Sequence, residues 1–344
     1  MSKLNVLIHL TAMSECLKEL GLRADLQFDT FRLEVASGGQ YFELLPEFLS
    51  GDSRAMKYHW TISEDVTLFG GWRASPRKQW TIASDKLAFK QFCARNQLRT
   101  PRWFEDSDES DALVLLKEKT KQPLQRGNID GPMPLSELAR GELRSRTDRY
   151  AEEFIAGESI EAWYWDGTLY CVERREQPYV VGDGTNTLRS LAERANVWNG
   201  VMQLDWSVVE AFGRQQGLDL DSVVPRGAKV TVDFRYNSAF RGLPQGNENV
   251  LKKLVGDVVH DQLVRAGQVL WRGIPEQTRA QTAFSVRATV DEQRNVWFTD
   301  MDADRYLHPD IYPVMMRSLF GIADLVAPPP PPPGLFGVPT GTHG

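Results

Sequence analysis

Residues 173–189 read ERREQPYVVGDGTNTLR, a hydrophobic run followed at once by Gly-Asp-Gly and a polar segment. The Tyr-Val-Val run at 179–181 suits a buried strand, and Thr185 or Asn186 is placed to cap a helix that follows. A dinucleotide-binding fingerprint needs a third glycine at position 187, where the chain has threonine. The stretch therefore predicts a strand, a glycine turn and a helix, and not a phosphate-binding loop.

Helices and strands alternate on both sides of this stretch. We expect a helix over 84–97, capped by Ser84 or Asp85, and a strand around Lys117. The short run VLIHL, at 6–10, predicts a core strand. The pattern also predicts a helix at 134–144, a strand at 149–155, a strand pair at 160–175 turned at Asp166-Gly167, helices near 202–217 and 248–268, a strand at 229–236 and a strand pair at 284–302.

The composition restricts the class of protein. The chain has 344 residues, 42% hydrophobic and 25% charged, which is ordinary for a globular protein with a large core. Its net charge of −6 argues against nucleic acid as the main partner. Cys16, Cys93 and Cys171 show no paired spacing, which predicts neither a zinc site nor a disulfide framework and suits a reducing compartment. No stretch approaches a membrane span, so we expect a cytoplasmic protein without a membrane partner.

The last predicted strand, VWFTDMD, carries the clearest chemistry. Alternation along it predicts that Phe298, Asp300 and Asp302 share one face. Two carboxylates beside bulky apolar neighbours are costly to bury without a cation, and oxygen ligands of this kind suit Mg²⁺ held together with substrate phosphates. A solvated acidic strand end is the alternative. Arg287, on the partner strand, either faces a phosphoryl oxygen or forms a salt bridge to one of the aspartates.

Five segments in this order resemble the ATP-grasp ligases, and among them the branch that contains cyanophycin synthetase and bifunctional glutathione synthetases. Gly-Asp-Gly before a helix start is typical of that branch, and KVTVDFRYNSAFRG (229–242) resembles a further strand and loop of these enzymes. The resemblance covers about 84–321. The five segments are SDKLAFK (84–90), LLKEK (115–119), EEFIAG (152–157), ERREQPYVVGDGTNTLRSL (173–191) and RAT with DMD (287–289 and 300–302).

The resemblance implies an α+β (α/β) fold of two lobes that clamp ATP, and it assigns roles to single residues. Two lysines meet the nucleotide phosphates, and a hinge at 152–155 reads the adenine edge. Glu158 or Glu161 takes the ribose hydroxyls, although the usual register gives this role to Ser159. The candidates are Lys86, Lys117, Glu152, Glu153, Phe154, Ile155, Glu158 and Glu161 for ATP, Asp300 and Asp302 for Mg²⁺, Arg287, Arg174 and Arg175 for catalysis, and Arg235, Asn237 and Arg241 for the substrate.

Three departures from the family pattern concern the same chemistry. The Arg-x-Asp that precedes the metal pair stands here as Arg-Ala-Thr at 287–289, so a threonine replaces one metal carboxylate unless Asp291 or Asp304 takes its place. The glycine-rich lid is reduced to TKQPLQRG at 120–127, and the arginine expected after the hinge glycine is Glu161. These changes bear on magnesium binding and on catalytic competence.

The implied activity is an ATP-dependent carboxylate–amine ligase that forms an amide or peptide bond through an acyl phosphate on an amino acid or peptide. One alternative is a carboxylate-activating enzyme for cyclisation or peptide modification; another is a non-catalytic nucleotide-binding scaffold, which Thr289 and the proline tail favour. We expect an N-terminal domain at 1–83, an ATP-grasp domain at 84–326 with its lid lobe at about 100–156, and a disordered Pro-rich tail at 327–344. The oligomeric state stays open, with a homodimer as one option.

Overall fold

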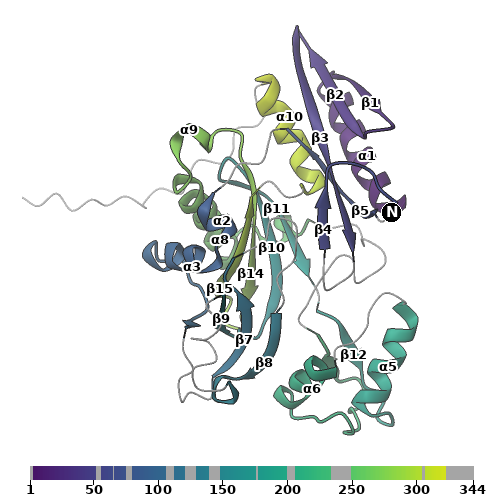
Figure 1. Cartoon of the computed structure of the whole chain (residues 1–344), viewed down its shortest axis with the longest axis vertical. Coiled ribbons are helices and arrows are strands. Elements are labelled where there is room, and N and C mark those ends of the chain that lie inside the picture. Colours follow the sequence, from purple (N-terminus) through teal and green to yellow (C-terminus); the bar gives the residue numbers. More distant parts are fainter. Residues whose placement is uncertain are drawn as a thin grey trace, which may run out of the picture.

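The computed structural model describes residues 3–51, 56–64, 66–74, 80–105, 112–120, 129–138, 148–175, 177–199, 206–233, 249–303 and 307–322. In these ranges, helices combine with sheets whose strands pair antiparallel (Figure 1). The α+β class expected from the sequence is confirmed. None of the helices described has both the length and the hydrophobicity that a membrane span requires.

The N-terminal part consists of one helix and a five-stranded sheet in the order β1-β2-β3-β4, with β5 paired to β3. The expected core strand at 6–10 is wrong, because this run lies inside the helix. Val6, Met13 and Cys16 are buried at helical spacing. The run at 6–10 covers too few residues to show this helical period. The elements are α1 (Lys3–Glu19), β1 (Arg23–Gln27), β2 (Arg32–Ser37), β3 (Gln40–Gly51), β4 (Met56–His59) and β5 (Val66–Arg73).

The central sheet has the strand order β11-β10-β14-β15. Both predicted strand pairs and the turn at Asp166-Gly167 are confirmed. Asp85 is the predicted cap, and its Oδ1 accepts from the N–H groups of Leu87 at 2.8 Å and Ala88 at 2.9 Å. The elements are β10 (Glu158–Trp165), β11 (Thr168–Arg175), β14 (Ala283–Val290), β15 (Val296–Ala303), α2 (Thr81–Ser84), α3 (Lys86–Arg95), α7 (Leu251–Leu254), α8 (Val258–Arg272) and α9 (Glu276–Arg279).

A second antiparallel sheet has the strand order β6-β9-β7-β8 and packs around its own small core. The strands expected around Lys117 and at 149–155 are confirmed as β7 and β9. The helix expected at 134–144 is only a 3₁₀ turn where it is described, and 139–144 lies outside the described residues. The elements are β6 (Trp103–Phe104), β7 (Leu113–Glu118), β8 (Ile129–Pro134), η1 (Leu135–Glu137) and β9 (Arg149–Glu153).

The Gly-Asp-Gly belongs to a small lobe, where it joins β12 (Tyr179–Val181) to α5 (Leu188–Asn199); the lobe also holds α6 (Trp206–Gln215) and β13 (Lys229–Thr231). Asp183 Oδ1 accepts from the N–H groups of Asn186 at 2.8 Å and Thr185 at 2.9 Å. These bonds, the Asn186 backbone first, hold the pKa of Asp183 below its usual value. A Cβ at Gly182 would lie 2.1 Å from the carbonyl oxygen of Pro225. The predicted strand, turn and helix are confirmed as a packed structural turn.

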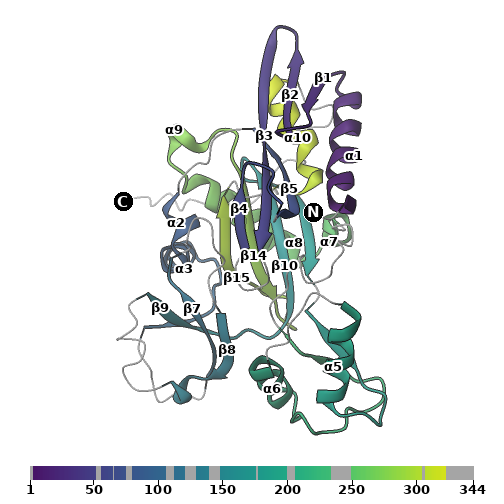
Figure 2. The ribbon, with the colours of Figure 1, turned by 45° about the vertical axis from the view of Figure 1, so that its right-hand side comes forward.

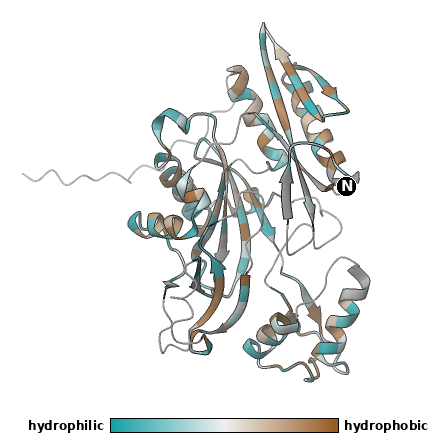
Figure 3. Cartoon of the chain, in the orientation of Figure 1, coloured by the Kyte–Doolittle hydropathy of each residue, from teal (hydrophilic) through white to brown (hydrophobic). Residues whose placement is uncertain are grey.

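One apolar cluster joins the N-terminal sheet to the last described elements, η3 (Pro309–Ile311) and α10 (Tyr312–Phe320). Met13 of α1 and Phe69 of β5 share this cluster with Met315 of α10 and Trp163 of β10. Figure 2 shows α1 and α10 side by side against the N-terminal sheet. In Figure 3, α1 and the N-terminal strands alternate between hydrophobic and hydrophilic residues, as this packing requires. The apolar core of the N-terminal sheet includes residues of α10. A separate N-terminal domain at 1–83 therefore stays a prediction.

The junction between α1, β5 and α10 contains a buried polar group. The hydroxyl of Tyr312 accepts the backbone N–H of Trp72 at 3.1 Å and lies 2.7 Å from Nδ1 of His9. A Cβ at Gly71 would lie 2.6 Å from the same hydroxyl, so the close approach requires glycine. Burial first, and then the charge of His308, lowers the pKa of His9 to about 3. His9 is therefore held neutral within the folded protein.

We expect His9 to make the protein less stable in mild acid. The unfolded chain binds a proton at His9 below about pH 6.5, and the folded chain only below about pH 3. The free energy of unfolding should therefore fall by about 1.4 kcal/mol per pH unit as pH drops through this window. His9→Gln keeps an acceptor for Tyr312 and should remove that part of the slope in urea unfolding followed by circular dichroism. His260→Gln, on α8, serves as the control, and an unchanged slope in His9→Gln would show that His9 does not titrate on unfolding.

Candidate functional site

A β-bulge in β15 decides which side chains form the candidate site. Arg287 pairs with Asp300 and Ala288 pairs with Phe298, so Thr299 is an extra residue in β15. Its hydroxyl donates to the carbonyl oxygen of Arg287 at 3.1 Å. The bulge reverses the alternation, and the expectation that Phe298 shares a face with the two aspartates is wrong. Phe298 lies in the apolar core, and Asp300 and Asp302 project from the opposite face of the sheet.

The guanidinium of Arg287 is surrounded by carboxylates on that polar face. It forms ion pairs with Asp302 and, through Nη1, with Asp300 Oδ2 at 3.3 Å. Its Nε lies 3.9 Å from Oε1 of Glu161, which accepts from the hydroxyl of Ser285 at 2.6 Å. Glu161, Asp300 and Asp302 are all buried. Three buried carboxylates thus converge on one guanidinium.

The departure at Thr289 places two hydroxyls side by side. Thr289 pairs with Ser159 across β14 and β10, and both residues are buried. Asp291 does not replace the missing carboxylate, because its Oδ2 accepts from Nε1 of Trp297 at 2.7 Å and from Nδ2 of Asn295 at 2.9 Å. These bonds commit Asp291 to the turn after β14. Asp304 lies outside the described residues.

A second buried charge cluster joins the helix α3 to the second sheet. Oε1 of Glu152 is 2.5 Å from Nζ of Lys117, and its Oε2 is 2.7 Å from Nζ of Lys90. Burial alone would raise the pKa of Glu152, but Lys117 and Lys90 outweigh it and hold this pKa below its usual value. Burial lowers the pKa of Lys90, against the opposing charge of Glu152. The hydroxyl of Tyr150 donates to Glu152 Oε2 at 3.1 Å.

Tyr150 connects the two clusters electrostatically. Its pKa is raised well above the usual value, first by burial, then by the charge of Glu152 and next by that of Asp300. The lysine cluster on the second sheet is therefore close enough to the central sheet's aspartates for their charges to act on one hydroxyl. Lys86, the first residue of α3, is also buried, and its backbone N–H donates to the carbonyl oxygen of Lys119 at 2.8 Å.

The predicted hinge at 152–155 begins in the last two residues of β9 and continues beyond it. The backbone of Glu153 donates to the carbonyl of Arg102 at 2.9 Å, and that of Phe154 to the carbonyl of Leu113 at 2.7 Å. The Phe154 ring packs edge-on against Phe212 of the small lobe, with centroids 5.5 Å apart. Ile155 follows with intermediate exposure. These bonds occupy the N–H groups of the second and third hinge residues and tie the hinge to the second sheet.

Several other candidates lie apart from the clusters. Glu158 forms an ion pair with Nε of Arg174 at 2.9 Å. By register, both share the face of Ile160, opposite to the aspartates. Arg175 pairs with Ser159 through the backbone, and its side chain is not among those described. The proposed substrate residues Arg235, Asn237 and Arg241 lie outside the described residues.

The structure also adds residues that the sequence reasoning missed. Lys90 lies one helical turn after Lys86 on α3, and Tyr150 lies two residues before Glu152 on the same strand face. Both spacings could have indicated them, because they place each side chain beside a residue already chosen. Ser285 carries no comparable signal, since only the pairing of β10 with β14 brings it to Glu161.

Comparisons with known proteins give weak similarities. No protein-family model matches the chain, and no curated protein matches it. It is similar to the solved structure of a bifunctional glutathione synthetase from Pasteurella multocida, with 13% identity and a TM-score of 0.44 over 90% of this chain and 43% of that chain. A D-alanine–D-alanine ligase from Bacillus anthracis has 12% identity and a TM-score of 0.34, over 70% and 66%. An ATP-grasp ligase complexed with a minimal precursor has 11% identity and a TM-score of 0.35, over 70% and 60%. The chain spans less than half the length of the Pasteurella protein.

We expect Glu152 to be essential for stability. Glu152→Gln leaves Lys90 and Lys117 buried without a carboxylate, which should lower the free energy of unfolding by about 3–5 kcal/mol. Urea unfolding followed by tryptophan fluorescence measures this. Glu153→Gln, at the next and more exposed position, is the matched control and should change stability by about 0.5 kcal/mol or less. Equal stability of the two variants would mean that the buried lysines do not depend on this carboxylate.

Proposed function

We propose that this chain is an ATP-grasp enzyme that uses ATP and Mg²⁺ to activate a carboxylate for ligation to an amine. The observation that carries the proposal is a pair of buried charge clusters, the lysines around Glu152 and the aspartates around Arg287, with charges of both acting on Tyr150. Lys117 and Asp300 occur in the sequence order that the resemblance requires. Glu152, the partner of Lys117, and Asp300 both act through their charge on the hydroxyl of Tyr150. Cationic groups and carboxylates placed together in this way are what nucleotide phosphates with a divalent cation need.

The lysines would provide the phosphate contacts. The side chain of Lys117 is already buried, so it would have little water to lose when a phosphate oxygen approaches. Lys90 balances Glu152 from the other side, which would let Lys117 turn toward a phosphate without leaving a carboxylate unpaired. Lys86 is a further candidate at the start of α3, where it would act through its side chain, because Asp85 and Lys119 already accept from the backbone N–H groups there. The hinge at 152–155 would lie against the adenine.

The residues of the acidic face fit a magnesium ion. Glu161, Asp300 and Asp302 offer only oxygen donors, and all three carboxylates are buried around Arg287. Asp300 and Asp302 would hold the ion, and Arg287 would be released toward a phosphate oxygen. Mg²⁺ bound there would neutralise charge on the phosphate oxygens. Thr289 and Ser159 would supply hydroxyls, not charge, at the neighbouring pair.

The proposed reaction joins a carboxylate oxygen to the γ-phosphorus of ATP, with ADP as the leaving group. An amine nitrogen then forms a bond to the acyl carbon as the acyl–phosphate bond breaks and phosphate leaves. In this scheme Lys117 and Arg287 orient the phosphoryl oxygens, and the contribution of the chain is positioning and charge neutralisation. A lid lobe at about 100–156 would keep water from the acyl phosphate. An amino acid or peptide is the proposed substrate, with Arg235, Asn237 and Arg241 as candidate contacts.

A second candidate function is a nucleotide-binding protein without catalysis. The buried pair of Thr289 and Ser159 favours it, because a hydroxyl stands where the resemblance requires a metal carboxylate. Phosphate release from ATP in the presence of amino acids and dipeptides, with mass spectrometry of the products, separates the two. An amide product supports the ligase, and ATP binding without any turnover supports the binding protein.

We expect Lys117→Ala to weaken ATP binding by at least about tenfold, roughly 1.4 kcal/mol. Lys117 points into the buried cluster, whereas Lys119, two residues on, pairs with the exposed Glu105 at 3.4 Å. Lys119→Ala is thus the matched control and should keep the affinity of the wild type in calorimetry with Mg²⁺ present. Equal losses in the two variants would place the phosphate contact elsewhere.

The acid pair gives a separate test. Asp300→Asn and Asp302→Asn should each lower turnover by at least about tenfold, or roughly 1.4 kcal/mol of transition-state stabilisation. Thr289→Asp should leave turnover unchanged or raise it, and should lower the magnesium concentration needed for half-maximal rate. Asp291→Asn, in the adjoining turn, is the control for a lost carboxylate. Full activity and an unaltered magnesium response in both asparagine variants would contradict the assigned metal site.

A further inference from the structure

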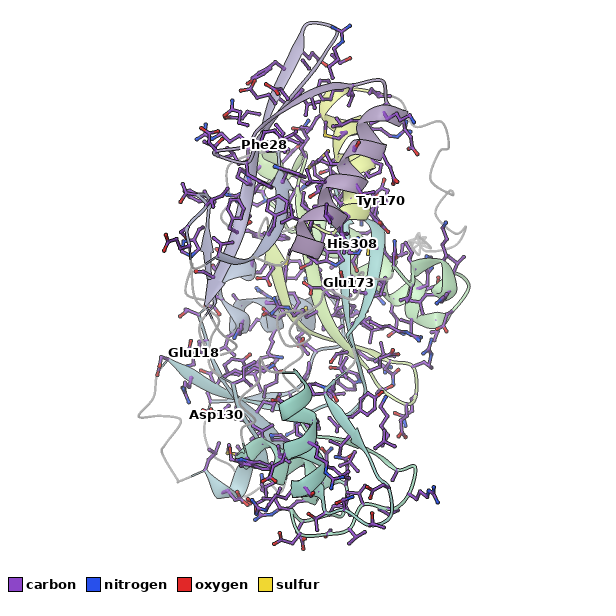
Figure 4. The ribbon with its side chains drawn as sticks, turned by 90° about the vertical axis from the view of Figure 1, so that its right-hand side faces the viewer. Phe28, Glu118, Asp130, Tyr170, Glu173 and His308 are labelled. Atoms are coloured by element: carbon purple, nitrogen blue, oxygen red, sulfur yellow. The ribbon has the colours of Figure 1, made fainter. Side chains whose placement is uncertain are left out.

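A second group of metal-ligating side chains lies where the segment after β15 meets β11. Cys171, His308 and Asp310 each offer one ligand atom, and these three atoms lie within 4.8 Å of one another. Cys171 comes from the middle of β11, and the other two from the start of η3. Figure 4 shows His308 beside Glu173, with Tyr170 further along β11. None of these residues takes part in the ATP and magnesium site proposed above.

The three residues combine a buried interior with an opening to solvent. Cys171 is fully buried and His308 is 3% exposed, so neither is a surface group that happens to lie near an acid. The side chain of Asp310 is 48% exposed. Asp310 is thus the member of the group that contacts solvent.

Asn249 holds two of the three residues in place. Its Oδ1 accepts the backbone N–H of Val172 at 3.1 Å, and its Nδ2 donates to the carbonyl of Tyr170 at 3.0 Å, so it brackets Cys171 on both sides. The same Nδ2 donates to Oδ2 of Asp310 at 2.7 Å. Outer hydrogen bonds of this kind orient the ligands of metal sites in proteins. Asp310 is left with Oδ1 directed to the cluster.

The ligand atoms lie slightly farther apart than in a tetrahedral site, so they would move closer together on binding an ion. Oδ1 of Asp310 lies 3.9 Å from Nδ1 of His308. Zinc bonds of about 2.0–2.3 Å put neighbouring ligand atoms about 3.3–3.8 Å apart. His308 Nδ1 accepts the N–H of Asp310 at 3.1 Å, and Nε2 lies 3.3 Å from Oε1 of Glu173. When an ion binds, one ring nitrogen of His308 replaces its present contact with a bond to the metal. The contact of the other nitrogen continues to orient the ring.

We propose that Cys171, His308 and Asp310 bind a divalent cation that prefers sulfur and nitrogen, with Zn²⁺ as the natural occupant. A thiolate and an imidazole are poor ligands for Mg²⁺, so the site is chemically distinct from the acidic face. Water completes the coordination. The cysteine pattern predicted no zinc site, because the partners of Cys171 come from a distant segment and no sequence spacing could show them.

The ion would fasten the segment 307–311 to β11. That segment leads directly into α10, which shares its core with α1 and the N-terminal sheet. The metal would thus fix the N-terminal part on the central sheet, next to the sheet end that carries Glu173. Its role is structural, and it does not require ATP binding or turnover.

The test is titration of the full chain with Co²⁺ and then Zn²⁺, without nucleotide. We expect one equivalent of Co²⁺ to give a thiolate charge-transfer band in the near ultraviolet, and Zn²⁺ to abolish the band by displacement. Cys171→Ser should lose the band. Cys16→Ser and Cys93→Ser, each lacking another buried cysteine, should keep it. Absence of the band in the wild type, or its persistence in Cys171→Ser, overturns the proposal.

Two milder variants decide the matter if Cys171→Ser does not fold. Asp310→Asn changes a half-exposed side chain and should weaken Zn²⁺ binding at least tenfold; Asn249→Ala should weaken it by about 10–100-fold, as is usual for outer contacts. Zn²⁺ should raise the melting temperature of the wild type more than that of Asp310→Asn. Wild-type affinity in Asp310→Asn overturns the site. An excess of Mg²⁺ should not displace the ion, so the result is independent of the proposed ATP chemistry.

Discussion

The buried carboxylate of Glu152 is the constraint on which the candidate site depends. This carboxylate cannot remain charged in the interior without cations. It pairs with Lys90 of α3 and Lys117 of β7. Three elements from separate parts of the chain must therefore meet at one point. Their meeting fixes the second sheet against the helix that covers the central sheet, and it brings Tyr150 within reach of the charge on Asp300.

The central sheet separates two environments by its alternation. One face is an apolar core against α3 and α8, and the other gathers Glu161, Glu173, Arg287 and the aspartates. A strand with perfect alternation would have placed Phe298 and Asp300 on the same face. The extra residue Thr299 lets β15 follow its core side with Phe298 and Met301 and still present both carboxylates to the polar side. The bulge thus reconciles a packing requirement with a chemical one.

Local signals predicted much of this arrangement. The cap at Asp85, the strand pairs of the central sheet and the structural turn at Gly-Asp-Gly all depend on neighbours in sequence, and all are confirmed. The N-terminal sheet was not predicted, and the run at 6–10 was taken for a strand, because its helical period appears only over a longer window. The bulge, the part of Lys90 and the surroundings of Cys171 arise from contacts between distant segments, which a single sequence does not display.

The shared core of the first and last described elements has a consequence for biosynthesis. Domains of a nascent chain generally fold in order from the N-terminus. Here the N-terminal sheet and α1 cannot complete their apolar core until the residues of α10 have left the ribosome, after all the sheets between them have been made. Until then the core-facing side of α1, including Met13, has no partner from α10. The N-terminal part should therefore acquire its final structure only after α10 has been made, and a ribosome that stalls before residue 312 would leave that surface open to chaperones.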